Sequence, residues 1–125
     1  MATRKRLHIQ NITRPLLRPL IVASCDDFRC RFLGLMGQRS LGQEEGLLFR
    51  WPKAGRVDTA IHMLFMRFPL AIIWLDAEGK VVDRRHARPW VDFLIPSAAA
   101  QYVLEIHPDR LDEFATGDQI QWHEI

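Results

Sequence analysis

His62 is the residue of this chain best suited to do chemistry, because it is the one ionisable side chain inside the apolar run 61–66. A buried imidazole can carry a perturbed proton affinity and act as a ligand or as an acid/base group. No Ser, Cys or Asp lies at a recognised motif spacing from it, and on an extended strand it would share a face with Leu64 and Met66. A hydrogen-bonded core histidine is therefore the competing interpretation.

A basic cluster precedes Trp90 and consists of Arg84, Arg85, His86 and Arg88. Arginines can hold phosphates while an indole stacks on a base, as in proteins that bind single-stranded nucleic acid. Alternate residues of a strand would equally place some of these charges in water. Nucleic-acid binding through Arg84, Arg85, Arg88 and Trp90 is thus one hypothesis, and a solvated strand face is its alternative.

The cysteines and histidines suggest no metal site. Cys25 and Cys30 are five residues apart, which on one helix separates them by more than ~7 Å, too far for an easy disulfide. We expect two free, mostly buried thiols. The five histidines form no H-x-H or H-E-x-x-H motif and no phosphate-binding glycine loop is present, so we predict neither a metal nor a cofactor.

The composition, with 48% hydrophobic and 26% charged residues, argues against a disordered or fibrous protein. A length of 125 residues fits one domain. No apolar run reaches the ~20 residues that span a bilayer, and the basic start is not followed by an apolar export signal. We predict a cytoplasmic protein with no membrane contact, a basic tail over residues 1–6 whose order is left open, and a single domain over residues 7–125.

The strongest element signal is at residues 61–79, where two apolar runs flank Arg67-Phe68-Pro69 and end in a turn sequence, Asp76-Ala77-Glu78-Gly79. They predict a buried strand pair feeding a hairpin. Asp76 and Glu78 resemble a carboxylate pair, but Asp and Gly at these positions favour a turn. Further strands are predicted over 7–12, 20–23, 47–51, 99–106 and 119–123, with a turn at 52–55, a helix of about three turns from Phe28 to Gly37 capped by Asp26 or Asp27, and a short helix over 110–114.

Strands outnumber helices in this pattern and do not alternate with long helices. The fold class predicted is therefore mainly β (α+β): a single compact antiparallel β-sandwich or barrel-like domain with about seven strands and two short helices.

Landmarks spread over nearly the whole chain resemble one prokaryotic family, domain of unknown function 192. They are Asn11, Gly34-Leu35-Met36-Gly37, Glu45-Gly46-Leu47-Leu48, Ile61-His62, Phe65-Met66-Arg67-Phe68-Pro69, Leu75-Asp76, Gly79-Lys80-Val81-Val82, Arg88-Pro89-Trp90, Val103-Leu104-Glu105 and Gly117-Asp118. The resemblance implies a compact β-rich sandwich or barrel with a helix after the second strand, and no established reaction, cofactor or substrate.

The family pattern singles out mostly glycines, prolines and methionines with structural explanations, and two polar exceptions, His62 and Glu105. These two are the weak catalytic candidates of a second hypothesis, a hydrolase-like enzyme with an acid/base pair. The family usually has an acidic residue where this chain has Ala71, so a site built on that carboxylate would be impaired or absent here.

The leading hypothesis is a non-enzymatic β-domain, a monomer or weak dimer, that binds a small ligand or a protein partner. Its ligand-binding groove is expected near His62, Arg67 and Trp90. A nucleic-acid partner is the least favoured of the three hypotheses.

Overall fold

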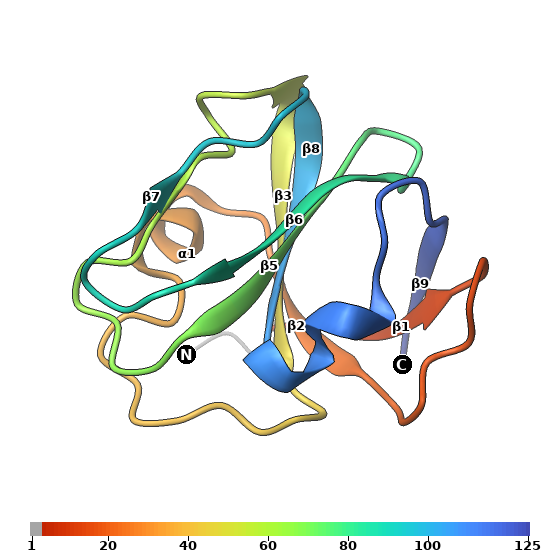
Figure 1. Ribbon diagram of the computed structural model, residues 1–125, viewed down its shortest axis with the longest axis horizontal. Coiled ribbons are helices and arrows are strands. Elements are labelled where there is room, and N and C mark those ends of the chain that lie inside the picture. Colours follow the sequence, from red (N-terminus) through yellow and green to blue (C-terminus); the bar gives the residue numbers. More distant parts are fainter. Residues whose placement is uncertain (1–3) are drawn as a thin grey trace.

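The computed structural model describes residues 4–125, which form a strongly curled β-sheet with a second, two-stranded sheet beside it (Figure 1). The large sheet has the strand order β6-β5-β8-β3-β2-β1-β9 and the small sheet pairs β4 with β7. The strands are β1 (Arg6–Asn11), β2 (Ile21–Cys25), β3 (Gly46–Gly55), β4 (Ile61–His62), β5 (Leu70–Leu75), β6 (Val81–Ala87), β7 (Phe93–Leu94), β8 (Ala100–Ile106) and β9 (Ile120–Glu124).

Two short helices complete the fold, α1 (Phe28–Leu33) and the 3-10 helix η1 (Pro108–Glu113). The predicted mainly β class with two short helices is confirmed, and the large sheet is a half-barrel rather than a flat layer. Its pairs are antiparallel except β2 with β3, which run parallel. The α1 region provides the crossover that a parallel pair requires.

The apolar run 70–75 is the central strand β5, and all six of its residues are buried. Successive side chains of a strand point to opposite faces. Leu70, Ile72 and Trp74 pack into one core cluster, and the three residues between them pack into the other. The run lacks polar alternation because both faces of the sheet are covered. One face packs against α1 and the β4–β7 ribbon, and the other face is turned towards the inside of the curled sheet.

The hairpin predicted after β5 is present and also closes the curl. The Asp76 carboxylate accepts hydrogen bonds from the backbone amides of Glu78 and Lys80, both at 2.9 Å, so Asp76 serves the turn rather than a carboxylate pair with Glu78. Beyond the turn, the Ile120 amide donates to the Gly79 carbonyl at 2.9 Å, which joins the hairpin to β9. The two edges of the sheet therefore meet at this end.

The helix at Phe28 is shorter than predicted. Asp27 caps it by accepting from the Cys30 amide at 2.7 Å, and Gly34, with φ +50°, ends it. The extension to Gly37 was wrong because Gly34 leaves the helical conformation there. Phe32 is 60% exposed, whereas Leu35 is buried.

The prediction of two free thiols was wrong, because Cys25 and Cys30 form a disulfide. The prediction assumed that both lie on one helix. Cys25 instead ends β2 and Cys30 lies on α1, so the chain reverses between them and their Cα atoms are 5.5 Å apart. Both residues belong to the core cluster beneath α1.

Two other segments differ from their predictions. β3 continues to Gly55 through the expected turn at 52–55. The run 61–66 is a strand only at β4, and turns follow it, so Leu64 is exposed whereas Met66 is buried. Of the basic tail predicted over residues 1–6, residues 1–3 lie outside the described part, and Arg6 begins β1. No helix in residues 4–125 is long and apolar enough to cross a membrane.

Candidate functional site

A cavity of about 220 Å³ lies between the large sheet, α1 and the β4–β7 ribbon. Apolar side chains make most of its wall, with Leu35, Phe49 and Leu70 among them. Polar side chains reach it from three segments: Arg31 on α1, Asp58 and His62 in the stretch 58–63, and Glu105 on β8. Of the residues predicted to form a site, the structure brings together His62 and Glu105.

Glu105 lies in the middle of the large sheet, on β8, and only 5% of its surface is exposed. Its neighbours across the two adjacent strands are Leu47 on β3 and Ile72 on β5, both apolar. In the described part of the chain, no side chain is paired with its carboxyl in an ion pair. Burial therefore raises the pKa of Glu105 to about 8, and the carboxyl is mostly protonated at neutral pH.

His62 reaches the cavity from the small sheet, where it pairs with Phe93 of β7. Its Nδ1 atom is buried, and no hydrogen-bond partner for it exists among residues 4–125. Buried polar atoms of native proteins almost always have a partner, so an orphaned nitrogen requires an explanation, such as an absent water or ligand. The expectation of a hydrogen-bonded core histidine does not hold for this atom.

Another part of the cavity wall is formed by Arg31, which lies over the ring of Trp51. The guanidinium carbon of Arg31 lies 5.9 Å from the centre of the Trp51 ring, and the Trp51 ring stacks on Phe49 at 6.0 Å. Arg31 donates to the carbonyls of Asp26 and Arg50, at 2.7 and 3.0 Å. Its charge is thus held in place by neutral acceptors.

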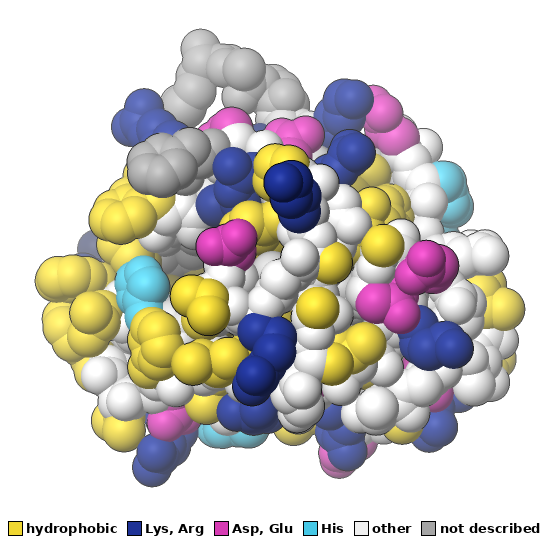
Figure 2. Space-filling view, turned by 90° about the horizontal axis from the view of Figure 1, so that it is seen from above, with side chains coloured by type: hydrophobic (Ala, Val, Ile, Leu, Met, Phe, Trp, Pro, Cys, Tyr) yellow, Lys and Arg dark blue, Asp and Glu magenta, His cyan; other side chains and the backbone are white. Residues whose placement is uncertain are grey.

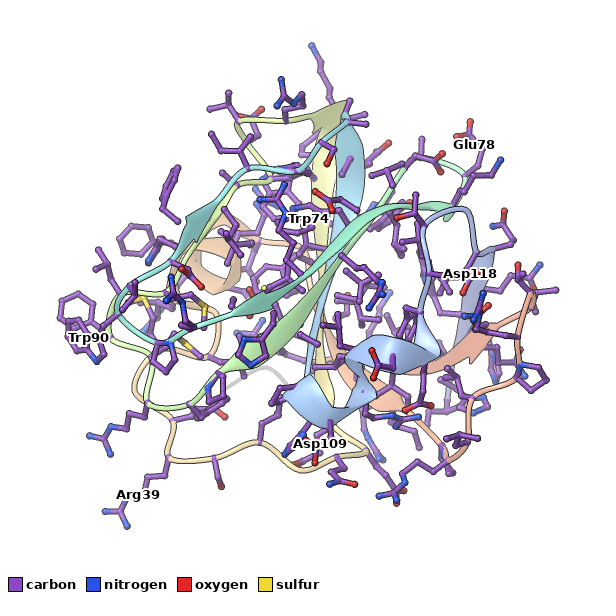
Figure 3. All side chains as sticks on the ribbon, viewed as in Figure 1. Arg39, Trp74, Glu78, Trp90, Asp109 and Asp118 are labelled. Carbon is purple, nitrogen blue, oxygen red and sulfur yellow. A yellow bond between two sulfur atoms is a disulfide. The ribbon has the colours of Figure 1, made fainter. Side chains whose placement is uncertain are left out.

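The other two predicted ligand-binding residues, Arg67 and Trp90, do not line this cavity. Trp90 is 56% exposed and projects from the end of the molecule at which α1 and β7 lie (Figure 3). It contacts the ring of Phe65 edge to face, with ring centres 5.0 Å apart. Arg67 is exposed in the loop before β5. These residues belong to a separate surface beside the cavity.

The three arginines of the nucleic-acid hypothesis are held by partners within the protein. Arg85 donates to Asp83 and to the Ile95 carbonyl, both at 2.8 Å, and Arg88 forms a forked pair with Asp92. Arg84 donates to the Leu111 carbonyl at 3.2 Å. None of the three lines the cavity, and they do not gather into one unpaired basic surface.

Several cavity residues could not be found from the sequence. Met36, Trp51 and Asp58 come from segments that only the fold brings together. Glu105 did have a signal, because a carboxylate inside an apolar strand contradicts the pattern around it. Ala71, at the position usually acidic in the family, packs into the opposite core cluster from Leu70, so its side chain faces away from the cavity. Within residues 4–125, no three His, Cys, Asp or Glu side chains gather as a metal site.

Comparisons with known proteins identify relatives. A family model for domain of unknown function 192 (DUF192), described as "Uncharacterized ACR", matches residues 11–122. A UPF0127 protein of Thermococcus sibiricus is 36% identical over 103 residues, which cover 81% of this chain and 65% of that protein. A UPF0127 protein of Pyrococcus furiosus is 30% identical over 117 residues, which cover 92% of this chain and 97% of that protein. The chain thus spans slightly less than two thirds of the Thermococcus relative.

Two crystal structures share the fold. A Sinorhizobium meliloti 1021 protein named as a "putative transcription regulator" superposes with a TM-score of 0.82 at 19% identity, covering 96% of this chain and 94% of the other. A Novosphingobium aromaticivorans protein of unknown function gives a TM-score of 0.74 at 21% identity, and the match covers 94% of this chain and 84% of the other. Together, the family-model match and the identity to the UPF0127 proteins show that this chain belongs to the DUF192 family.

Proposed function

We propose that this domain binds a small, mostly apolar molecule with one hydrogen-bonding group in the cavity between the sheet and α1. The observation that carries the proposal is that two polar residues line a cavity with mostly apolar walls. The buried carboxyl of Glu105 has no ion-pair partner among the described residues, and the buried Nδ1 atom of His62 has no hydrogen-bond partner there. Ligand sites are characteristically apolar cavities with a few polar groups that orient the ligand.

The protonation of Glu105 indicates what the ligand offers. A neutral carboxyl donates one hydrogen bond, and its raised pKa means that it does so at neutral pH. A carbonyl or carboxylate oxygen on the ligand accepts that bond. His62 Nδ1 provides a second hydrogen bond to the same group, as donor or acceptor according to its tautomer.

The size of the cavity limits the ligand. Its volume of about 220 Å³ is below the ~300–1,000 Å³ typical of sites for drug-sized molecules. Three methionines, Met36, Met63 and Met66, line it, and flexible thioether side chains adapt to apolar ligands of different shape. A monocyclic or short aliphatic carbonyl compound fits these constraints.

Benzoate and benzamide are suitable probes because they share one ring and differ in charge. Binding is measured by NMR on the methionine methyl groups, of which three line the cavity. We expect both probes to shift these signals, and Glu105→Leu to abolish the shifts. Glu105→Gln keeps a neutral donor of similar volume and is expected to keep benzamide binding. Absence of any methyl shift at millimolar probe would contradict the proposal.

A second pair of variants tests His62. Asparagine places a polar atom near the position of Nδ1, so His62→Asn is expected to keep more binding than His62→Ala. The His62→Ala protein is expected to stay folded, since the imidazole is only half-buried and makes no internal hydrogen bond through Nδ1. A His62→Ala protein that unfolds would show that the residue supports the core instead.

An acid/base enzyme is the second candidate, favoured by the same raised pKa of Glu105. A carboxyl that titrates near 8 suits a general acid at neutral pH. Hydrolysis of p-nitrophenyl acetate distinguishes the candidates, because an enzyme loses turnover in Glu105→Gln whereas a binding domain shows no turnover dependent on Glu105. Nucleic-acid binding receives less support, because Arg85 and Arg88 are already paired with carboxylates.

A further inference from the structure

Five large apolar side chains are exposed at one end of the molecule, and we call them the aromatic patch: Leu64, Phe65, Trp90, Val91 and Phe93. Their exposed fractions run from 48% to 66%. Figure 2 shows hydrophobic side chains gathered at the left edge of its face, the end at which Figure 1 places α1 and β7. A contiguous exposed apolar surface of this kind marks an interaction site, unlike single scattered side chains.

The backbone holds the two ring-bearing turns of the patch against each other. The Trp90 amide donates to the Met63 carbonyl at 2.7 Å, and the Met63 amide donates to the Asp92 carbonyl at 3.0 Å. Phe65 and Trp90 both have positive φ angles, 63° and 66°. Bulky residues rarely adopt this conformation, and such strain concentrates at functional sites. The fold therefore maintains an unfavourable backbone that presents two aromatic rings to the exterior.

The charges around the patch are mainly positive. Arg67 lies two residues after Phe65, and Arg39 lies two residues after Gly37, whose amide donates to the Phe65 carbonyl at 3.2 Å. Arg88 and Asp92 form an ion pair at 2.8 Å, so these two charges largely cancel. A second copy of this face would bring like charges together. The charge instead complements an anionic surface.

We propose that the aromatic patch docks this domain onto an anionic membrane surface. Trp and Phe rings settle at the boundary between lipid head groups and acyl chains, and nearby arginines bind the anionic head groups. Trp90 points outward from the molecule rather than into a groove (Figure 3), which suits insertion into a fluid surface. The expectation of no membrane contact depended on the lack of a spanning segment, and surface docking needs none.

The patch adjoins the cavity without being part of it. His62, which lines the cavity, pairs with Phe93 of the patch, and Met63 bonds to Trp90. A protein docked in this way holds the cavity near the membrane. The docking proposal does not depend on what the cavity binds.

Co-sedimentation with lipid vesicles tests the proposal. The full chain is mixed at low ionic strength with phosphatidylcholine vesicles that either contain or lack phosphatidylglycerol. We expect binding to the anionic vesicles and weak or no binding to the neutral ones. Phe65→Ser/Trp90→Ser is expected to weaken binding more than about tenfold, and Arg67→Gln about fivefold. Leu17→Ser is the matched control, because Leu17 is 88% exposed on the β1–β2 connection and is expected to bind like the wild type.

Each other outcome overturns the proposal. A wild-type protein that stays in the supernatant with anionic vesicles has no membrane affinity. Equal binding to both vesicle types would show that the arginines do not contribute to binding. Wild-type binding by the double serine variant would show that the two aromatic rings do not contribute. A wild-type dimer that the double variant dissociates in the absence of lipid would identify a second copy as the occupant. Circular dichroism of each variant establishes that it is folded.

Discussion

His62 and Glu105 face one cavity from two different sheets, His62 from the two-stranded ribbon and Glu105 from the centre of the half-barrel. Neither group is neutralised by a charged partner among the described residues. A site assembled in this way depends on how the ribbon packs over the large sheet, so it is lost if either element moves. Unpaired polar groups in a core reduce stability, which makes their retention at a cavity a sign of function.

The pH dependence of folding gives the first test of Glu105. Burial raises its folded-state pKa to about 8 from the ordinary value of 4.5. Because the folded state holds the proton more tightly, this group contributes its stability below about pH 4.5 and loses it progressively as the pH rises to about 8. The slope is at most ~1.4 kcal/mol per pH unit. Urea unfolding at a series of pH values measures it.

Glu105→Gln is the control for that measurement, because it keeps the shape and removes the titration. The variant is expected to show a flatter profile between pH 4.5 and 8 than the wild type, and to be the more stable protein at pH 8. Identical profiles for the two proteins would mean that Glu105 is ionised in the folded state.

Gly46→Ala tests how closely the strands pack beneath the cavity. A Cβ atom at Gly46 would lie 2.4 Å from the Glu105 carbonyl oxygen and 2.8 Å from the Ile106 side chain. Since the backbone of the paired β8 strand must shift, we expect a loss of ~3 kcal/mol in the free energy of unfolding. At Gly55, on the same strand, the new atom lies 3.7 Å from its nearest neighbour. Gly55→Ala is therefore expected to be neutral or up to ~1 kcal/mol stabilising, and equal losses at the two positions would refute this account.

The sequence predicts this fold where a local pattern is sufficient. The apolar run 70–75 and the turn with Asp76 and Gly79 were predicted from neighbouring residues and are confirmed. A helix cap was predicted at Asp26 or Asp27, and the structure shows it at Asp27. The parallel pairing of β2 with β3 could not be predicted, because it arises from a crossover that buries α1 against the sheet. The disulfide was missed for the same reason, since the 5.5 Å separation depends on the reversal between β2 and α1.

For the candidate site too, the sequence predicts some residues, whereas only the fold determines how they come together. His62 was identified as an ionisable residue in an apolar run, and Glu105 as a polar exception in the pattern of the family that the chain resembles. Their common cavity depends on the β4–β7 ribbon, whose strands have two residues each and no pattern of their own. The placement of Trp90 outside the cavity likewise depends on a positive φ angle that no local pattern of this chain predicts.

Removal of the disulfide tests the placement of α1. Cys25→Ala/Cys30→Ala avoids new polar groups in the core and is expected to cost ~2 kcal/mol, because a short loop is no longer closed in the unfolded chain. The wild type in dithiothreitol is expected to unfold at the urea concentration of the double variant, which itself should not respond to dithiothreitol. Alkylation of two thiols in the unreduced, denatured wild type would show that the bond is absent.

Arg110 is a buried arginine that ties η1 to the β1–β2 connection. It is 2% exposed, pairs with Glu113 through two hydrogen bonds of 2.7 and 2.9 Å, and donates to the carbonyls of Arg18, Pro19 and Gln43. Arg110→Met leaves these acceptors and one carboxylate unpaired, so we expect a loss of ~3–5 kcal/mol in the free energy of unfolding. Arg110→Lys keeps the charge but lacks the planar fork, and its loss is expected to be intermediate.

The pKa of Glu113 provides a second measurement on the same pair. The hydrogen bonds from Arg110 lower it, so the pair contributes stability at neutral pH that is lost as the pH falls below the ordinary glutamate pKa of 4.5. We expect Glu113→Gln and Arg110→Lys both to reduce this acid-induced loss, measured by urea unfolding between neutral and acidic pH. A wild-type acid profile in Arg110→Lys would mean that the forked geometry of the guanidinium is not what holds the carboxylate, and that a charge alone is sufficient.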